Sequence, residues 1–492
     1  LGATDGDIAS VRSLGYAAWL EQQFAQAPSR SNWDWLVSKG VDTNPDARAV
    51  AIGVDSQVWQ RLLAAPDSLR QRVALALSEI FVVGFDGITG PWKQFKLAAY
   101  WDLLAANAFG SFRALLEAVT LSPAMGNYLN MAGNQKEDPA TGRMPDENYA
   151  REVMQLFTIG LLELNPDGTA RIDAQGRTIE SYGQDTVTNL ARVFTGWNLD
   201  ARRGDDSPEL MRRPMVLNPA LHSTVAASFL GATVPAGTEG TAALKTALDT
   251  LAAHPNVGPF IGRQLIQRLV TSNPSPAYVR RVAQAFADNG AGQRGDLKAV
   301  LRAVLLDDEA RGSAGLSSPS FGRLREPLQR LLQWARAFKA TSASSDWTLG
   351  NLSDPSTRLG QSPQRAPSVF NFFRPGYVPA GTAIGSAGLV APEFQLATET
   401  SVAGYLNYMQ NLVAGGHPDL KPDYSAELAI AGDAAALVAR VERLLSAGQL
   451  SASARQTIVA AVESLSATTA ATSRVHTAVL LVLASPDYLI QR

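Results

Sequence analysis

The side chains best able to do chemistry are gathered in one stretch, PDENYAREVMQLFTIG. On a helix with 3.6 residues per turn, an arc of about 100° collects four polar residues: Asn148, Arg151, Glu152 and Gln155. A carboxylate can act as an acid or a base, while the arginine and amide groups can hold a substrate by hydrogen bonds. The same face could also be an ordinary solvated one, in which Glu147 pairs with Arg151. Asn is a poor helix former, which weakens the second interpretation, and both stay open.

Glu79 is a second candidate, because it is the only charge between Val73 and Val83. A helix that is apolar nearly all round is a buried helix. A buried carboxylate must pair with a cation or take up a proton. Arg72, two turns earlier on the same side, or an arginine of another helix could be that cation. Glu79 is therefore either half of a structural ion pair or an acid with a raised pKa that lines a cleft.

Two further segments place aromatic side chains beside arginine and asparagine. ARVFTGWN puts Arg192 and Trp197 at the end of a helix, where the indole could stack on a sugar or anchor the packing. SVFNFFRPGY surrounds Asn371, Arg374 and Tyr377 with phenylalanines. Such a loop suits recognition of a carbohydrate or a partner, and it equally suits a plug packed onto the core.

The remaining polar residues form no pattern typical of a metal, nucleotide or thiol site. The chain has no cysteine, which excludes disulfides, thiol nucleophiles and Cys-type zinc sites. Its four histidines lack HExxH spacing, and GxSxG, Walker A and paired GxGxxG motifs are absent. NPDGTARIDAQG offers Asp167 and Asp173, but not in the order of an EF-hand. We predict no metal site and name no cofactor, although distant His and carboxylate ligands stay possible.

Helical periodicity positions most of these residues. Expected helices include the one that carries Glu79, from Pro66 to Gly84, and others at 146–160, 256–270 and 390–413. LLELNPDGTARIDAQGRTIESY predicts a β-hairpin, and STVAASFLGATVPAG a second pair of short strands. We predict a mainly α fold: one large domain over residues 1–492, a multi-helix bundle with one or two small β-hairpins. Long loops are expected near 198–240 and 342–388.

Composition excludes several classes of function. Hydrophobic residues make up 46% and charged residues 18%, below the usual share of about 25%, so the chain should form a compact globule. With 43 basic and 45 acidic residues and no basic stripe, we expect no nucleic-acid binding and no polybasic docking to membranes. No apolar run approaches the ~20 residues that a transmembrane segment needs.

The chain resembles the bacterial "domain of unknown function 1800" family over its whole length. PDENYAREVMQLFTIGL, YGQDTVTNLARVFTGWN and SPQRAPSVFNFFRPGYVP carry the resemblance, in that order. Asp146 departs from the Asn that members usually have there. The resemblance implies a mainly helical protein that is exported, and a gene neighbourhood that suggests an exported, sulfatase-like partner protein. It supplies no reaction.

These observations leave two functional hypotheses. In the first, the protein is a periplasmic or extracellular enzyme acting on a polysaccharide or glycoconjugate, with its signal segment absent from this chain. Glu152 and Glu79 are then the acid and base, and the other residues singled out above bind substrate: Asn148, Arg151, Gln155, Arg192, Trp197, Asn371, Arg374 and Tyr377. In the second, it is a non-catalytic exported scaffold or surface-assembly protein, in which the motif at 145–160 is a structural ion-pair network.

Overall fold

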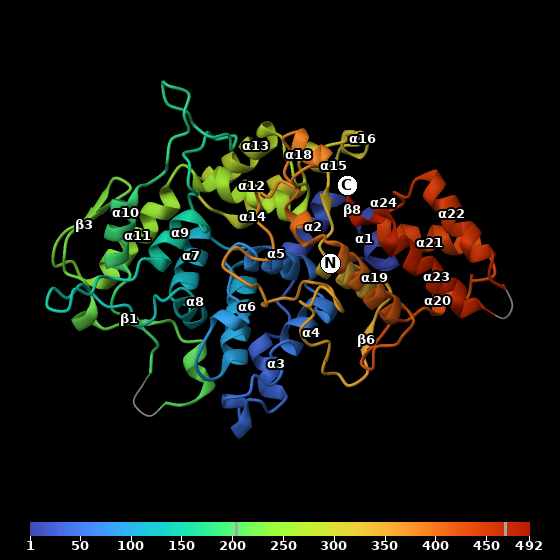
Figure 1. Ribbon diagram of the computed structural model, residues 1–492, viewed down its shortest axis with the longest axis horizontal. Helices are drawn as coiled ribbons and strands as arrows, with labels where there is room; N and C mark the ends of the chain where they lie inside the picture. Colours follow the sequence, from blue (N-terminus) through green and yellow to red (C-terminus); the bar gives the residue numbers. More distant parts are fainter. Residues whose placement is uncertain (202–204, 467–469) are drawn as a thin grey trace.

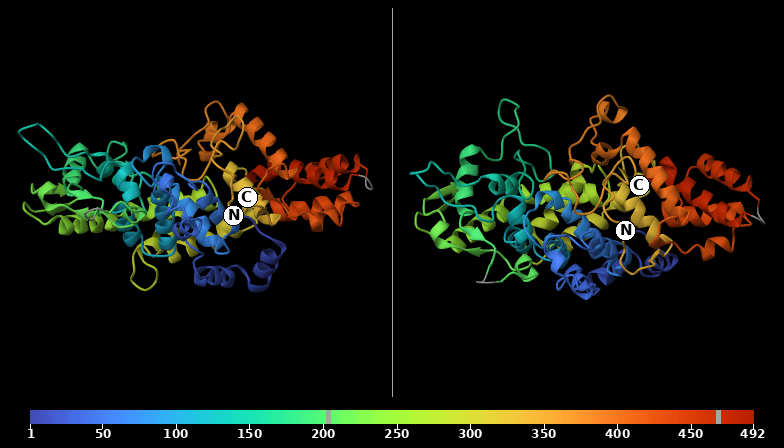
Figure 2. Two further views of the ribbon diagram at one scale, coloured as in Figure 1. Left: turned by 90° about the horizontal axis from the view of Figure 1, so that it is seen from below. Right: turned by 60° about the horizontal axis from the view of Figure 1, so that its bottom comes forward.

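The computed structural model describes residues 1–201, 205–466 and 470–492 of the chain. The molecule is elongated, and both termini lie near its middle (Figures 1 and 2). The first helices form the centre, the elements around α10 and α11 form one end, and the last helices, α20 to α24, form the other. The fold is mainly α, as the periodicity predicts.

The first third of the chain contributes nine α-helices among the described residues. They are α1 (Asp5–Leu14), α2 (Tyr16–Ala25), α3 (Asn32–Ser38), α4 (Ser56–Ala64), α5 (Ser68–Ser78), α6 (Lys93–Asn107), α7 (Phe112–Thr120), α8 (Pro123–Tyr128) and α9 (Asn148–Gln155). The single turns η1 (Pro45–Arg48) and η2 (Phe85–Gly87) connect them. Helix α5 packs between α2, α4 and α6 and is buried along most of its length.

The remaining helices follow in two groups. The first group is α10 (Gln184–Val193), α11 (Gly240–Ala253), α12 (Val257–Leu269), α13 (Pro276–Ala287), α14 (Leu297–Leu305), α15 (Asp308–Arg311), α16 (Ala314–Ser317) and α17 (Pro327–Ala337), with η3 (Pro208–Met211) and η4 (Pro219–Leu221). The second is α18 (Ala383–Ser386), η5 (Pro392–Leu396), α19 (Glu399–Val413), α20 (Ser425–Leu428), α21 (Ala434–Ser446), α22 (Ala452–Glu463), α23 (Ala471–Ala484) and α24 (Pro486–Leu489).

Strands are short and pair in twos, all antiparallel. The pairs are β1 (Trp197–Asn198) with β2 (Val216–Leu217), β3 (Ala227–Phe229) with β4 (Ala232–Val234), β5 (Arg323–Leu324) with β8 (Ile490–Gln491), and β6 (Thr341–Ser342) with β7 (Leu420–Lys421). The β3–β4 hairpin lies in one of the two predicted strand regions. In the other, residues 161–181 form a narrow ribbon of isolated bridges that projects from the body (Figure 1).

One hydrophobic cluster runs from Leu20 to Tyr488 and holds the helices together. Its largest fully buried side chains include Trp59, Trp101 and Trp334. Dispersion contacts among such large groups, together with their removal from water, account for most of the favourable energy of a helical globule. The cluster joins the amino-terminal, central and carboxyl-terminal helices in one core.

Three expected helices differ from their predicted bounds: two end earlier, and the third begins later. Helix α9 stops at Gln155, not near 160, because the amides of Ile159 and Gly160 both donate to the Met154 carbonyl, with Gly160 in a left-handed conformation (φ 73°). Helix α5 stops at Ser78, so Glu79 is its C-terminal cap. The region 390–413 divides into η5 and α19 because Thr398 and Ser401 form a capping box between them.

Candidate functional site

One residue of the polar face of α9, Arg151, belongs to a surface network centred on Glu147. The Glu147 carboxylate accepts hydrogen bonds from Arg151 (3.1 Å), from Gln184 (2.8 Å) and from the Thr188 hydroxyl (2.7 Å). The predicted pairing of Glu147 with Arg151 is confirmed. Arg151 also donates to the side-chain oxygen of Gln184 at 3.1 Å, so the network joins α9 to α10. Half-buried groups of this kind stabilise the helix pair modestly.

Glu152, on the same helix, is in a different environment. Its side chain is buried, and its Oε2 atom has no hydrogen-bond partner among the described residues. Burial raises the pKa of Glu152, and the charge of Arg151 opposes that rise. The hydroxyl of Tyr182 is also buried without a partner there, and burial, followed by the charge of Glu152, raises its pKa to about 12. Two polar groups that need partners therefore lie close together.

A pocket of about 450 Å³ opens between the end of α9, helix α12 and the loop after Val369. Its apolar walls are Ile80, Leu156, Leu161, Leu162, Leu164, Pro259, Phe260, Val369, Phe370 and Pro375. Its polar lining is Glu79, Gln155, Arg263, Gln264, Gln267, Arg268 and Arg374. Ligand sites usually have about 300–1,000 Å³, mainly apolar walls and a few polar groups, so this pocket has the size and composition of a small-molecule site.

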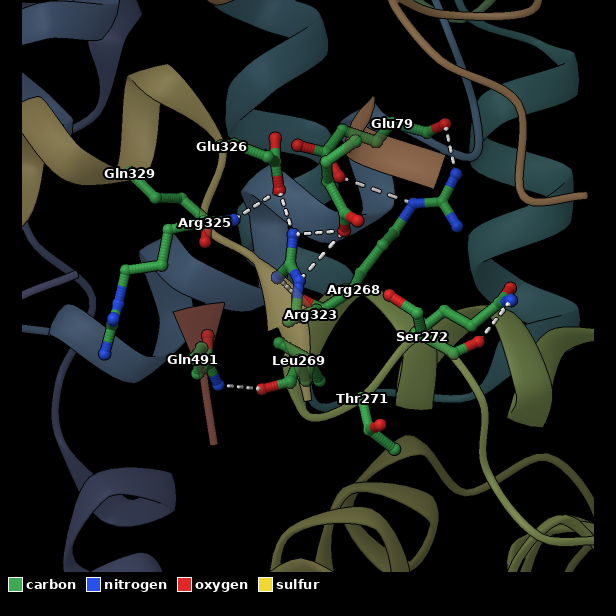
Figure 3. A network of polar contacts seen from close by, with 12 residues as sticks. Glu79, Arg268, Leu269, Thr271, Ser272, Arg323, Arg325, Glu326, Gln329 and Gln491 are labelled. Atoms are coloured by element: carbon green, nitrogen blue, oxygen red, sulfur yellow. Dashed lines mark hydrogen bonds and ion pairs between the residues drawn. The ribbon is translucent and has the colours of Figure 1, made fainter. Parts of the chain in front are cut away.

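Glu79 reaches this pocket from the end of α5 and meets Arg268 of α12 (Figure 3). The Arg268 Nε atom lies 3.4 Å from Glu79 Oε2, and Nη2 donates to the Glu79 carbonyl at 2.9 Å. Both residues stand at helix C-termini, where the helix dipole favours a cation and disfavours an anion. The cation predicted for Glu79 is therefore supplied mainly by another helix.

The Glu79–Arg268 pair is one edge of a larger buried network (Figure 3). Arg323 donates to Glu326 at 2.6 Å and to Glu393 at 2.9 Å. Gln361 donates to the other oxygen of Glu326 at 2.7 Å. The carbonyl of Arg268 accepts from Arg323 and, on the opposite side, from Arg72. Segments far apart in sequence are thus tied together at the centre of the molecule.

Proton affinities within the network diverge. Burial, reinforced by the negative charge of Glu326, raises the pKa of Glu79 well above its usual range, and Arg268 and Arg72 only partly oppose this. Burial acts on Glu326 too, but Arg323, the contact with Glu79 and Arg72 outweigh it and lower its pKa to about 2. Burial thus favours the protonated form of Glu79, whereas the neighbouring cations favour the charged form of Glu326. A carboxylic acid that keeps its proton beside a pocket can donate it.

Comparison with known proteins gives one match. The model of a family described as "Protein of unknown function (DUF1800)" matches residues 1–490. The chain belongs to the DUF1800 family. No curated protein and no solved structure matches it significantly.

Three of the predicted site residues of this DUF1800 chain line the pocket: Glu79, Gln155 and Arg374. The Arg374 guanidinium stacks on Phe370, 4.7 Å from the ring centre. Asn371 lies beneath them and, with Glu79, lines a cavity of about 20 Å³, room for about one water molecule. The side-chain nitrogen of Asn371, Nδ2, has no hydrogen-bond partner among the described residues.

The other predicted residues lie outside the lining of this pocket. Asn148, Arg151 and Glu152 belong to the first turns of α9, before Gln155. Arg192 donates to Asn189 of its own helix at 2.6 Å, and the Trp197 indole is buried in β1. Tyr377 is half-buried at the end of the aromatic loop. Their predicted roles in substrate binding remain predictions.

Several pocket and network residues escaped the sequence reasoning: Arg268, Gln264, Gln267, Arg323, Glu326 and Glu393. A weaker signal was available in α12, VGPFIGRQLIQRL, where Arg268 and two glutamines stand among apolar residues of a helix that is buried along most of its length. No such pattern marks Glu393, because it lies in a single 3₁₀ turn.

Within residues 1–201, 205–466 and 470–492, no three or more His, Asp or Glu side chains are grouped as a metal ion requires. In the same residues, no helix combines the length and the apolar character needed to cross a membrane.

Proposed function

We propose that the protein is an exported enzyme that acts on a glycoconjugate, with the substrate held in the pocket between α9, α12 and the loop after Val369. The observation that carries the proposal is the position of Glu79, a buried carboxyl group with a raised pKa at the wall of a pocket of ligand size. Active sites are the usual place for carboxyl groups whose pKa burial has shifted strongly.

The lining of the pocket supports a glycoconjugate over a plain polysaccharide. Five polar residues other than the Glu79–Arg268 pair can hydrogen-bond to sugar hydroxyls: Gln155, Gln264, Gln267, Arg263 and Arg374. Leucines and phenylalanines face them and would hold an apolar aglycone. A bare polysaccharide would leave these walls in contact with sugar hydroxyls, which would then lack hydrogen-bond partners.

The proposed reaction is hydrolysis of the bond between the sugar and its aglycone. Glu79 gives its proton to the leaving oxygen as the carbon–oxygen bond breaks. A water oxygen forms the new bond to the sugar carbon, and the water gives up a proton to a base. Glu152 is the candidate for that base, because it is buried three residues before Gln155, on the same face of α9. It lies outside the pocket lining, so the proposed proton transfer to it runs through a bridging water molecule. Arg268 stabilises the carboxylate that Glu79 becomes.

The proposal can be tested with a set of octyl glycosides that carry different sugars. The corresponding free oligosaccharides, which lack the octyl group, are the matched control ligands. Isothermal titration calorimetry would compare the unmodified protein with Leu161→Trp, which fills the pocket from a side chain that is 55% exposed. Ile172→Trp is the control, since Ile172 is 64% exposed and outside the pocket lining. We expect an octyl glycoside to bind at least tenfold more weakly to Leu161→Trp and unchanged to the control. The substrate assignment is overturned if the free oligosaccharide binds as tightly as the octyl glycoside. It is also overturned if Leu161→Trp binds the octyl glycoside as tightly as the unmodified protein does.

Export and catalysis have separate tests. Fractionation of native cells should recover the protein in the periplasm or the medium, and recovery with a cytoplasmic marker enzyme would refute export. For an octyl glycoside that is cleaved, Glu79→Gln and Glu152→Gln should each lower kcat by 100-fold or more, as loss of a general acid or base typically does. Cleavage at the unmodified rate by both variants would refute the assigned acid and base.

A second candidate function, a non-catalytic exported scaffold, has its own supporting observation. The Glu147–Arg151–Gln184 network joins α9 to α10 and can be wholly structural. The partner in this alternative is an exported protein with a sulfatase-like fold. Isolation of a stable complex with such a protein, unaltered by Glu79→Gln and Leu161→Trp, would favour the scaffold. Loss of that complex in Leu161→Trp would instead place the pocket in the interface.

A further inference from the structure

A second pocket, of about 290 Å³, lies on the other side of the buried network. It is enclosed by β5 and the start of α17, by η5 and α19, and by the last residues of the chain from Ala484 to Ile490. Most of its lining is apolar: Leu324, Pro327, Phe394, Leu396, Ala397, Val402, Leu406, Ala484, Pro486, Leu489 and Ile490. It shares no lining residue with the pocket of the proposed function.

Glu393 is the polar group that makes this pocket unusual. Its side chain is 2% exposed and belongs to the lining. One carboxylate oxygen, Oε1, is held by Arg323 Nε at 2.9 Å and Nη2 at 2.8 Å. The other oxygen, Oε2, has no hydrogen-bond partner among the described residues. A buried carboxylate oxygen left without a donor costs about 1–3 kcal/mol, so a ligand that supplies a donor gains affinity.

The charges around Glu393 restrict which chemical group of a ligand can be that donor. Arg323 is on one side, and Arg330, which also lines the pocket, lies over the Tyr405 ring at 4.7 Å from its centre. The Nε atom of Arg330 is already bonded to the Arg325 carbonyl at 2.7 Å. The two guanidinium groups of Arg323 and Arg330 balance the two carboxyl groups of Glu393 and Glu326, so a charged ligand would lose its hydration without a net electrostatic attraction. A neutral group avoids this cost.

A hydroxyl group fits best among the neutral groups, because it can donate and accept. Burial raises the pKa of Glu393, with Arg323 opposing and Glu326 reinforcing the rise, which favours the protonated form of this carboxyl group. A hydroxyl donates to the ionised form and accepts from the protonated form. The apolar lining then accommodates the hydrocarbon part of the same molecule.

We propose that this second pocket binds an apolar molecule of medium chain length ending in a neutral hydroxyl group, with the hydroxyl on Glu393 Oε2. Val402 belongs to the lining and is 52% exposed, so it stands on the solvent side of the pocket. The site is independent of the proposed enzyme activity, since it uses different residues. The network nevertheless joins the two pockets, because Arg323 holds both Glu393 and Glu326, and Glu326 faces Glu79.

The test compares three probes of equal chain length: 1-octanol, octylamine and octanoate. Isothermal titration calorimetry at pH 7 on the full chain would give the dissociation constant of each. We expect 1-octanol to bind at least tenfold more tightly than either charged probe. Tighter binding of octylamine or octanoate, or no measurable binding of 1-octanol, overturns the proposal.

Variants locate the binding site without disturbing the core. Val402→Trp fills the solvent side of the pocket, and Leu428→Trp places the same new side chain at a position that is 41% exposed and outside the lining. We expect Val402→Trp to weaken 1-octanol binding at least tenfold, and Leu428→Trp to leave it unchanged. Leu161→Trp, which blocks the other pocket, should also leave it unchanged. Octanol binding that is lost in Leu161→Trp but retained in Val402→Trp would assign the probe to the first pocket and refute the second site.

Discussion

Replacing Arg323 by methionine tests the central claim about the buried network. Arg323 is fully buried and makes ion pairs with Glu326 (2.6 Å) and Glu393 (2.8 Å). It also donates to the Arg268 carbonyl. Methionine keeps an unbranched side chain but ends before the guanidinium group, so the substitution removes the cation together with the volume of that group. Two buried carboxylates then lose their main partner.

Loss of Arg323 should lower the free energy of unfolding strongly. Removal of one partner from a buried ion pair typically costs about 3–5 kcal/mol, because the other charge stays buried and unpaired. Independently, the network lowers the pKa of Glu326 from 4.5 to about 2. At about 1.4 kcal/mol for each tenfold change in proton affinity, this corresponds to about 3 kcal/mol. We expect Arg323→Met to lower the free energy of unfolding by about 3–5 kcal/mol at pH 7.

The loss should depend on pH with a defined sign. The folded-state pKa of Glu326 lies below its unfolded value, so its contribution is fully present above pH 4.5 and is lost as the pH falls towards 2. Without Arg323, Glu326 can stay neutral by taking up a proton. Urea unfolding followed by tryptophan fluorescence at pH 7 and pH 4 would therefore show a smaller difference between variant and unmodified protein at pH 4.

Arg302→Met is the matched control. Arg302 pairs with Glu21 at 2.5 Å, but both side chains are substantially exposed. Exposed pairs contribute about 0–1 kcal/mol, so the control should unfold within that range of the unmodified protein. If Arg323→Met were no more destabilising than Arg302→Met, or if its effect were the same at both pH values, the network would not be the electrostatic centre described here.

Three further predictions concern other parts of the fold. Burial raises the pKa of Asp102 to about 6, although the Trp33 and Asn32 amides oppose this rise. The contribution of Asp102 to the free energy of unfolding is therefore full below pH 3.8 and is lost as the pH rises through about 6. Asp102→Asn should therefore gain stability relative to the unmodified protein by up to about 3 kcal/mol between pH 4 and pH 7 in urea unfolding, and a constant difference would contradict this. Gly196 has φ 83°, and an added Cβ would lie 2.8 Å from the Asn218 carbonyl, so Gly196→Ala should cost about 2–3 kcal/mol and lower Tm. Asn371 has φ 62°, so Asn371→Gly should change stability by less than about 1 kcal/mol, whereas Asn371→Val should lose more than that; equal Tm values for the two variants would refute the conformational argument.

The candidate site was only partly predictable from sequence. Glu79 was identifiable because a lone charge in an apolar helix needs a partner, and the structure supplies Arg268 as that partner. Arg268 itself is 189 residues away, and nothing local indicates which helix it packs against. The face of α9 was predicted as one polar arc, yet only Gln155 reaches the pocket, because the helix ends there and the chain turns at Gly160.

The aromatic loop illustrates the same limit. Its composition indicates recognition or packing. Phe373 is buried, whereas Arg374 and Phe370 line the pocket, and their role in recognition stays a prediction. An irregular loop has no fixed period, so its sequence pattern does not show which side chains face the core and which face the pocket. No local sequence pattern marks Glu393 as a site residue, since its environment is built from strands and helices that meet only in the folded chain.

The sequence by itself determined the helical class, the burial of α5 and the need to neutralise Glu79. These follow from local periodicity and from the cost of burying a charge, and both are set by residues within a few turns of one another. Only the tertiary structure decided that Arg72, Arg268, Arg323, Glu326 and Glu393 share one network with a pocket on each side. Which distant charges meet depends on how whole helices pack, and that is fixed by the summed burial of the core and not by any single segment.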